Sequence, residues 1–270
     1  MEAKIISENF LAKALQKTHI SREKIEEIIN AKIKLDNEEV DIININALGE
    51  EEVVSKLDRA YAHEFGLLHR TVNAFVLTQS KKIVLQRRSH FKKAQPLCLS
   101  IYGGHLEAGS NYREGIESEL KEELLDISKK EISRYQLQGS FEFIKREIHL
   151  DEEAKNNEAR KLYVYQATPL EMIKIDYYRK KLTDEKLKRT REQYKSYLKS
   201  EYDKKGKGYG EVWGIYYLDL EDLRKQDSMI LEDIFKPGRY SDRAEYTTDL
   251  LLPLMHDKYV MEKLAEIISR

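Results

Sequence analysis

The feature that most constrains the fold of this chain is a glycine loop followed by three closely spaced glutamates. The loop begins at Gly104, and the glutamates are Glu119, Glu122 and Glu123, here called the glutamate cluster. Side chains at positions i, i+3 and i+4 of a helix lie on one side of it, where like charges repel by about 0.2–0.5 kcal/mol per pair. Helix propensity alone therefore does not explain the cluster. A divalent cation does, because hard cations such as Mg²⁺ bind carboxylates together with phosphate oxygens.

The stretch from Gly104 to Leu125 resembles the Nudix box, the loop–helix signature of diphosphate-cleaving hydrolases. The resemblance implies that the glutamate cluster binds Mg²⁺ or Mn²⁺, with the carbonyl of Gly104 as a further ligand. It also implies catalytic roles for these glutamates, one of Glu122 and Glu123 being a candidate base. Three positions of the box carry other residues here: Ser110 for its first Glu, Ser118 for its Arg and Leu125 for its closing Gly.

A basic segment before the box extends the resemblance. Residues 87–96, Arg-Arg-Ser-His-Phe-Lys-Lys-Ala-Gln-Pro, resemble a stretch of the isopentenyl diphosphate isomerases, which belong to the same superfamily. The resemblance implies that Arg88 and Lys92 hold the diphosphate of the substrate. A guanidinium fork and a compact ammonium suit that group. Outside the box, Glu211 at the start of a predicted strand is a further candidate for the general base.

The isomerases bind a metal with three histidines and two glutamates, and parts of that set have counterparts here. His63, His69 and His105 fall near the histidine positions, and Glu158 matches one glutamate, whereas Asn156 occupies the other position. We interpret the three histidines as structural residues that form hydrogen bonds at the strand ends.

The catalytic cysteine of the isomerases would fall at Gly103, and Cys98 lies five residues too early, in an apolar segment typical of a core. The glutamate cluster, which is degraded in the isomerases, is intact here. The sequence therefore favours a metal-dependent hydrolase that uses water to cleave a diphosphate linkage in a nucleotide or a related nucleoside-diphosphate-linked substrate. Two alternatives stay open. The first is an isomerase-like enzyme acting on prenyl diphosphates. The second is a Nudix module that binds a nucleotide without cleaving it, which Ser110 and Ser118 favour because they replace the Glu and the Arg of the box.

Segments rich in β-branched and aromatic residues alternate with helical patterns along the chain. This alternation indicates an α/β protein, and the resemblance implies a Nudix-type α/β/α sandwich with a mixed sheet. We expect a Nudix domain over residues 38–270. The predicted strands cover 40–45, 71–78, 83–88, 99–102, 136–148, 161–168 and 211–220, and the predicted final helices cover 244–255 and 258–268.

Two regions lie outside the minimal domain. Residues 1–37 are predicted to form a helical extension, whose apolar stripe can pack against the domain or a second subunit, so a homodimer is possible. Residues 170–210 are predicted to form a helical, basic, tyrosine-rich insertion, with thirteen Lys/Arg against seven Asp/Glu between 171 and 207. We favour a solvated helical hairpin for this insertion over a lid that grips an anionic substrate.

Composition restricts the class of partner. The formal net charge is −1, which argues against nucleic acid or a membrane surface as the partner, and no apolar run approaches the length of a membrane span. Cys98 is the single cysteine and the first residues do not form a secretory signal, so we expect a cytoplasmic protein. The expected ligand is a small-molecule diphosphate.

Overall fold

The computed structural model of this chain describes most of the protein from residue 35 onward. The described ranges are 35–92, 95–127, 131–150, 155–205, 209–225, 228–235, 240–247 and 252–270, together with residues 21, 23, 26 and 27. The predicted helices of residues 1–37 lie almost wholly outside the described residues. The chain divides into two compact units. The described residues of the first unit lie within 1–72, 104–115 and 146–161, and those of the second lie within 73–103, 116–145 and 162–270.

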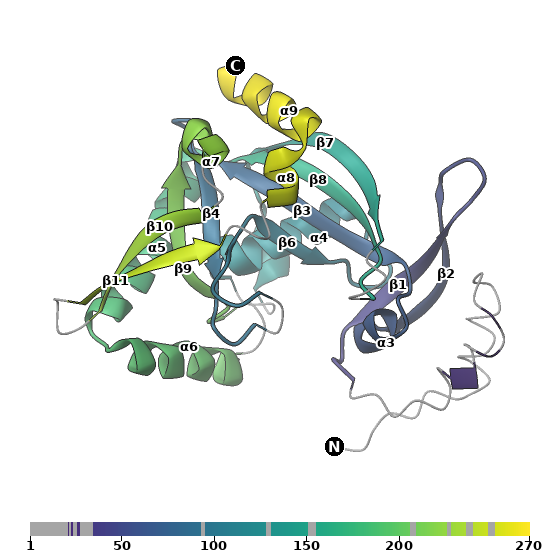
Figure 1. Ribbon diagram of the computed structural model, residues 1–270, viewed down its shortest axis with the longest axis horizontal. Coiled ribbons are helices and arrows are strands. Elements are labelled where there is room, and N and C mark those ends of the chain that lie inside the picture. Colours follow the sequence, from purple (N-terminus) through teal and green to yellow (C-terminus); the bar gives the residue numbers. More distant parts are fainter. Residues whose placement is uncertain are drawn as a thin grey trace. The chain divides into compact units, whose positions relative to one another are not determined.

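The strands pair into a mixed sheet, as the sequence predicted. In the described part of the chain the hydrogen-bonded order is β2-β1-β3-β4-β5, with β6 and β8 also on β3, β7 on β8 and β9 on β4 (Figure 1). Most pairs whose register is known are antiparallel, whereas β3 and β8 run in the same direction, because His69 N donates to Asn157 O and Ala167 N donates to Leu77 O. The strands span Glu39–Ile45 (β1), Glu51–Asp58 (β2), His69–Leu77 (β3), Ile83–Arg88 (β4), Leu99–Ser100 (β5), Tyr102–His105 (β6), Ser140–His149 (β7), Glu158–Gln166 (β8) and Val212–Leu218 (β9).

The first unit is built on the antiparallel pair β1–β2 and the short helix α3, Arg59–Glu64. Asp58 begins this helix, because its side chain accepts a hydrogen bond from the backbone N–H of Ala60 at 2.9 Å. The sequence did not predict β2, whose run Glu-Glu-Val-Val-Ser-Lys-Leu-Asp is mostly polar and lacks clear alternation. The core of this unit consists of Val40, Ile42, Leu57, Ala62 and Leu67.

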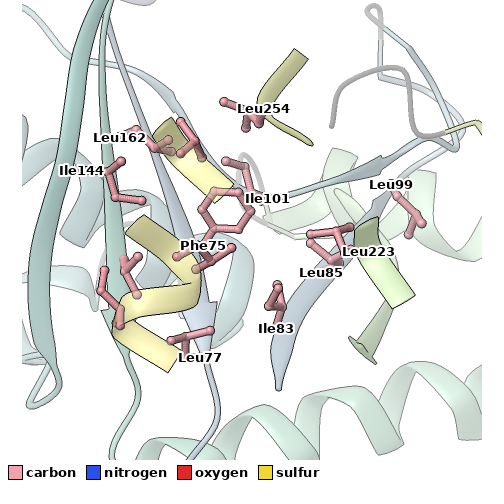
Figure 2. Packing of buried hydrophobic residues seen from close by; sticks show 14 residues of the cluster. Phe75, Leu77, Ile83, Leu85, Leu99, Ile101, Ile144, Leu162, Leu223 and Leu254 are labelled. Atoms are coloured by element: carbon pink, nitrogen blue, oxygen red, sulfur yellow. The ribbon is translucent and has the colours of Figure 1, made fainter. Parts of the chain in front are cut away.

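The second unit has an apolar core between the central strands and the C-terminal helices. Phe75 and Leu77 on β3 and Ile83 and Leu85 on β4 lie in this core, which also contains Leu254 (Figure 2). Three further helices contribute to the unit: α7 at Leu220–Lys225, α8 at Leu252–His256 and α9 at Lys258–Ser269. Helix α9 was predicted, and its buried side is made by Val260, Met261, Leu264 and Ile267.

The segment predicted to be a helical insertion contains two helices, α5 at Pro169–Leu187 and α6 at Arg191–Lys205. Thr168 and Glu171 form a reciprocal capping box at the start of α5. In a packed hairpin the tyrosines would lie on its inner side, and only some of them do. Tyr178 and Tyr194 are buried, whereas Tyr177 is 73% exposed. The hydroxyl of Tyr194 donates to the carbonyl of Trp213 on β9 at 3.0 Å, so α6 is attached to the sheet of this unit.

The predicted helix over residues 244–255 is wrong in its first part. Residues 240–247 form β11, which pairs antiparallel with β10, Ser228–Phe235, and α8 begins only at Leu252. The β-branched and aromatic residues Tyr246 and Thr247 favour a strand, and pairing with β10 satisfies the backbone there. Among the described residues, no helix is long and apolar enough to cross a membrane.

Candidate active site

The glutamate cluster lies where an α-helix changes into a π-helix. Helix α4 spans Tyr112–Glu119 and continues directly as a π-helix over Leu120–Leu124. Each backbone hydrogen bond of a π-helix spans one residue more than in an α-helix, and such turns often occur at functional sites. The sequence predicted one helix here, and its spacing pattern does not distinguish the two helix types.

Both polar caps and apolar packing hold this helix in place. Glu114 N donates to Asn111 Oδ1 at 2.9 Å, and Asn111 N donates to Glu114 Oε2 at 3.0 Å, which is a capping box. Ile116, Leu120 and Leu124 are fully buried. The apolar face of the helix is therefore anchored, and the positions of the glutamates are fixed with it.

All three glutamates of the cluster are buried, with exposed fractions of 9% for Glu119, 5% for Glu122 and 3% for Glu123. Burying several carboxylates on one helical segment is costly unless cations compensate their charge. Carboxylate oxygens are the ligands that Mg²⁺ and Mn²⁺ prefer. The donor set that the structure brings together therefore fits a hard divalent cation.

Strand β4 holds Glu123 through Gln86. Because side chains alternate along a strand, Ile83 and Leu85 enter the core while Gln86 points to the opposite face. There Gln86 Nε2 donates to Glu123 Oε2 at 2.5 Å and to the carbonyl of Ile101 at 3.3 Å. Strand β4 thus has the core on one face and the glutamate-bearing helix on the other, as in the predicted α/β/α arrangement.

Lys92 and Glu211 form an ion pair, although the sequence analysis predicted separate roles for them, Lys92 in binding the diphosphate and Glu211 as a general base. The distance from Lys92 Nζ to Glu211 Oε2 is 2.7 Å, and the side chains are 20% and 6% exposed. Glu211 directly precedes β9, and its carbonyl accepts a hydrogen bond from Ser89 N at 2.8 Å. The ion pair and this hydrogen bond therefore connect the segment after β4 to the start of β9.

The pKa of the Glu123 carboxyl group depends on its burial and on four neighbouring side chains. Burial raises the pKa of Glu123, and the nearby carboxylate of Glu211 raises it further. The charges of Lys92 and Arg88 and the hydrogen bond from Gln86 lower the pKa and so oppose these two effects. The structure thus brings Glu211, Lys92 and Arg88 within electrostatic reach of Glu123. A further cation here would favour the ionised carboxylate.

Gly104, the remaining predicted ligand, lies on β6 and belongs to the first unit. The glutamate cluster, Glu211, Arg88 and Lys92 belong to the second unit. The role of the Gly104 carbonyl stays a prediction.

The three histidines converge within the first unit, from α3, β3 and β6. His63 Nε2 lies 3.1 Å from His105 Nε2, and His69 Nδ1 lies 2.8 Å from the carbonyl of Leu67. The ring centroids of the three imidazoles are 5.0–5.1 Å apart. Burial is the main cause of a lowered pKa for both His63, to about 4, and His69. These two imidazoles are therefore neutral at pH 7.

Glu158, which occupies the position of an isomerase metal ligand, accepts hydrogen bonds from neighbouring side chains. Its Oε2 accepts hydrogen bonds from Arg160 at 2.6 Å and Thr71 at 3.2 Å, and its Oε1 accepts one from Asn156 Nδ2 at 3.0 Å. Hydrogen bonds and the charge of Arg160 lower the pKa of Glu158 in spite of its burial. The carboxylate is therefore ionised and fixed in place.

Comparison with known proteins decides the family. The model of the NUDIX domain matches residues 67–184 of the chain. The chain is also 33% identical, over 130 residues, to an uncharacterised Nudix hydrolase, all7351, from Nostoc sp. (strain PCC 7120), and the match covers 45% of this chain and 77% of that protein. This chain belongs to the Nudix hydrolase family. Membership of the isomerase-like subgroup stays a prediction.

Solved structures similar to this Nudix protein include DR0079 from Deinococcus radiodurans, at 22% identity and a TM-score of 0.36. That match covers 48% of this chain and 73% of DR0079. Another is the NUDIX domain of Shewanella oneidensis NrtR, solved with ADP ribose, at 12% identity and a TM-score of 0.33. It covers 57% of this chain and 74% of that one.

Sequence reasoning missed one residue of this Nudix site. Gln86 was predicted only as part of a strand, yet its Nε2 donates a hydrogen bond to Glu123 Oε2 of the glutamate cluster. A signal was present: Gln86 follows the apolar run Ile-Val-Leu and is 1% exposed. A buried amide needs hydrogen-bond partners, so a glutamine on a central strand indicates a polar neighbour on that face.

Proposed function

We propose that this Nudix hydrolase cleaves a diphosphate linkage in a nucleotide or a related nucleoside-diphosphate-linked substrate by attack of water. The observation that carries the proposal is the burial of the glutamate cluster on one helical segment, with Glu211, Lys92 and Arg88 close to Glu123. Such an arrangement combines ligands for a cation with cationic groups for phosphate oxygens.

The glutamate cluster would hold Mg²⁺ or Mn²⁺, with the Gly104 carbonyl as a further ligand by resemblance. When bound, the ion would neutralise phosphate charge and lower the pKa of a bound water. Gln86 would orient Glu123 for this role, because its amide donates to one carboxylate oxygen and leaves the other available.

The basic residues would hold the phosphate that is not attacked. Lys92 supplies a point charge and Arg88 a planar fork, which together match a diphosphate group. A carboxylate, either Glu211 or one of Glu122 and Glu123, would accept the proton of the attacking water. The hydrogen bond from Lys92 Nζ to Glu211 Oε2, at 2.7 Å, would hold this carboxylate in position beside the phosphate-binding residues.

The test is release of phosphate, diphosphate or nucleoside monophosphate from a panel of nucleotides, nucleotide sugars, dinucleotides and prenyl diphosphates, with Mg²⁺ or Mn²⁺. The proposal expects release that depends on the metal and falls by orders of magnitude in Glu122→Gln and Glu123→Gln. Glu117→Gln, on α4 but outside the glutamate cluster, is the matched control. Retained activity in either of the first two variants would contradict the assignment.

Two other results would replace the proposal. If nothing is cleaved while ligands on the panel raise the thermal stability, the chain is a binding module. If a prenyl diphosphate shows migration of its double bond without phosphate release, the chain is an isomerase.

A further inference from the structure

Tyr102, at the start of β6, has a buried hydroxyl group that forms no hydrogen bond within the described part of the chain. Its side chain is 0% exposed. A phenol hydroxyl can donate one hydrogen bond and accept others. Buried polar groups of native proteins nearly always have a partner, so an exception near a candidate active site points to a role in the reaction or to a bound ion or water.

Two other tyrosines of the second unit show what a buried hydroxyl normally does. Tyr194 and Tyr165 are also fully buried. The hydroxyl of Tyr194 donates to the carbonyl of Trp213 at 3.0 Å, and that of Tyr165 donates to Glu171 Oε1 at 2.6 Å. A phenylalanine at position 102 would fill the same space without an unsatisfied polar atom, which destabilises a fold. Packing alone therefore does not explain a tyrosine here.

Tyr102 follows a residue that is connected to the glutamate cluster. The side chain of Ile101 lies in the apolar core of the second unit. Its carbonyl accepts a hydrogen bond at 3.3 Å from Gln86 Nε2, the same atom that donates to Glu123 Oε2 at 2.5 Å. The amide of Gln86 thus joins the backbone next to Tyr102 to a predicted metal ligand.

The side chain of Tyr102 also lies within electrostatic reach of Glu123. Burial is the main cause of the raised pKa of Tyr102, and the charge of Glu123 is the next cause. The hydroxyl is therefore protonated at pH 7 and can donate. Tyr217, which also acts on Tyr102, already donates its own hydroxyl to Asp176 at 2.8 Å.

A divalent cation on the glutamate cluster would bring oxygen atoms to this region. Mg²⁺ takes oxygen ligands and usually keeps several of its waters. Carboxylates that bind a metal are in turn hydrogen-bonded by outer residues, which orient them. A neutral phenol suits that outer position, because it can donate to a carboxylate or exchange a hydrogen bond with a water.

We propose that Tyr102 is a positioning residue of this cation site, and that its hydroxyl forms a hydrogen bond with an oxygen ligand of the bound ion. Gln86 orients Glu123 before the ion binds, whereas Tyr102 gains its partner when the ion binds. The sequence analysis included Tyr102 only in a predicted strand, over residues 99–102. This inference rests on the cation site of the proposed function, but not on which diphosphate is cleaved.

The test compares Tyr102→Phe with wild type, because this substitution removes the hydroxyl and keeps the ring. Calorimetric titration of the metal-free full chain with Mn²⁺ measures the affinity, and the melting temperature is measured with a chelator present. We expect Mn²⁺ to bind about 10–100-fold more weakly, as for loss of an outer hydrogen-bond partner. Without metal, the melting temperature should equal or exceed that of wild type, since an unsatisfied group has been removed.

Tyr194→Phe is the matched control, because Tyr194 is equally buried but its hydroxyl has a partner. This variant should melt at a lower temperature than wild type without metal and should bind Mn²⁺ with the affinity of wild type. The two variants should therefore differ in opposite ways. A general loosening of the core would instead lower the melting temperature of both.

The proposal is overturned if Tyr102→Phe binds Mn²⁺ as tightly as wild type. It is also overturned if this variant is less stable than wild type without metal, because its hydroxyl would then have a partner before the ion binds. Glu122→Gln separates this inference from the proposed function. If Glu122→Gln binds Mn²⁺ as tightly as wild type, the cation site is wrong and both fail; if Glu122→Gln loses binding and Tyr102→Phe retains it, only the role of Tyr102 fails.

Discussion

Lys92 Nζ lies 2.7 Å from Glu211 Oε2, so the residue proposed to hold phosphate is paired with the candidate base. A phosphate group that binds to Lys92 must compete with this carboxylate. Both side chains are largely buried, and hydrogen bonds to charged groups contribute about 1.5–3 kcal/mol. The ion pair should therefore reduce the affinity for substrate.

Glu211→Gln should consequently lower kcat and also lower KM, because the substitution releases Lys92 from its strongest competitor. Lys92→Met should instead raise KM by about 10–150-fold, which corresponds to losing about 1.5–3 kcal/mol of binding. Steady-state kinetics of both variants and of the double variant measure these effects. In the double variant the fall in KM should disappear. An unchanged or raised KM in Glu211→Gln alone would contradict competition between the carboxylate and the substrate.

The hydrogen bond from Gln86 to Glu123 leads to a prediction about pH. The bond favours the ionised carboxylate, so its loss in Gln86→Leu raises the pKa of Glu123 further. The acidic limb of the profile of kcat/KM against pH should therefore move to higher pH, while activity well above that limb approaches wild type. Gln136→Leu, at an exposed position, is the control. A parallel loss of activity at every pH would mean that Gln86 acts on the fold and not on the ionisation of Glu123.

The parts of the fold that were predicted from sequence are those with strong local patterns. The apolar runs of β3 and β4 and the amphipathic pattern of α9 correspond to elements of the structure. Strand β2 was missed because its charged residues carry no period-two pattern. Residues 244–247 were predicted to be helical but belong to β11, because the pairing of β11 with β10 is a tertiary contact that local propensity does not encode.

Some features of the candidate site were likewise predicted from the sequence, and others were not. The spacing of the glutamate cluster could be read from the sequence because it lies on one helix. The pairs Gln86–Glu123 and Lys92–Glu211 join residues 37 and 119 positions apart, and no local pattern connects them. The three histidines were noticed but interpreted as structural, since their convergence depends on how α3, β3 and β6 pack. Contacts of this kind depend on tertiary packing, so local sequence patterns do not predict them.

Gly210 fixes the start of the segment that carries Glu211. Its φ is +67°, and a Cβ atom there would lie 2.2 Å from the backbone carbonyl oxygen of Leu198 on α6. Gly210→Ala should therefore destabilise the fold by about 1–3 kcal/mol from backbone strain, with a further loss from the clash, and should lower activity by moving Glu211. Gly49→Ala is the matched control, because φ is +79° there and no atom lies within 4 Å of the added Cβ. Denaturant unfolding should show a clearly larger loss for Gly210→Ala; equal losses would rule out the clash.

Glu171 makes the stability of the insertion depend on pH. Its carboxylate accepts hydrogen bonds from Tyr165 Oη at 2.6 Å, Thr168 N at 2.8 Å and Gln138 N at 2.9 Å, and it lies in the first turn of α5, where the helix dipole favours negative charge. These hydrogen bonds lower the pKa of Glu171 below its ordinary value of 4.5, against the effect of burial.

A carboxyl group with a lowered pKa in the folded state stabilises the fold above the pKa of the unfolded chain. That contribution is lost as the pH falls from about 4.5 through the lower pKa of the folded protein. The free energy of unfolding of wild type should therefore decline over this window more steeply than that of Glu171→Gln, which should be less stable by about 1 kcal/mol at pH 7. Glu221→Gln, an exposed residue in the first turn of α7, is the control. Chemical unfolding between pH 3 and pH 7 measures the difference, and equal slopes for wild type and Glu171→Gln would show that the network does not control the acid stability.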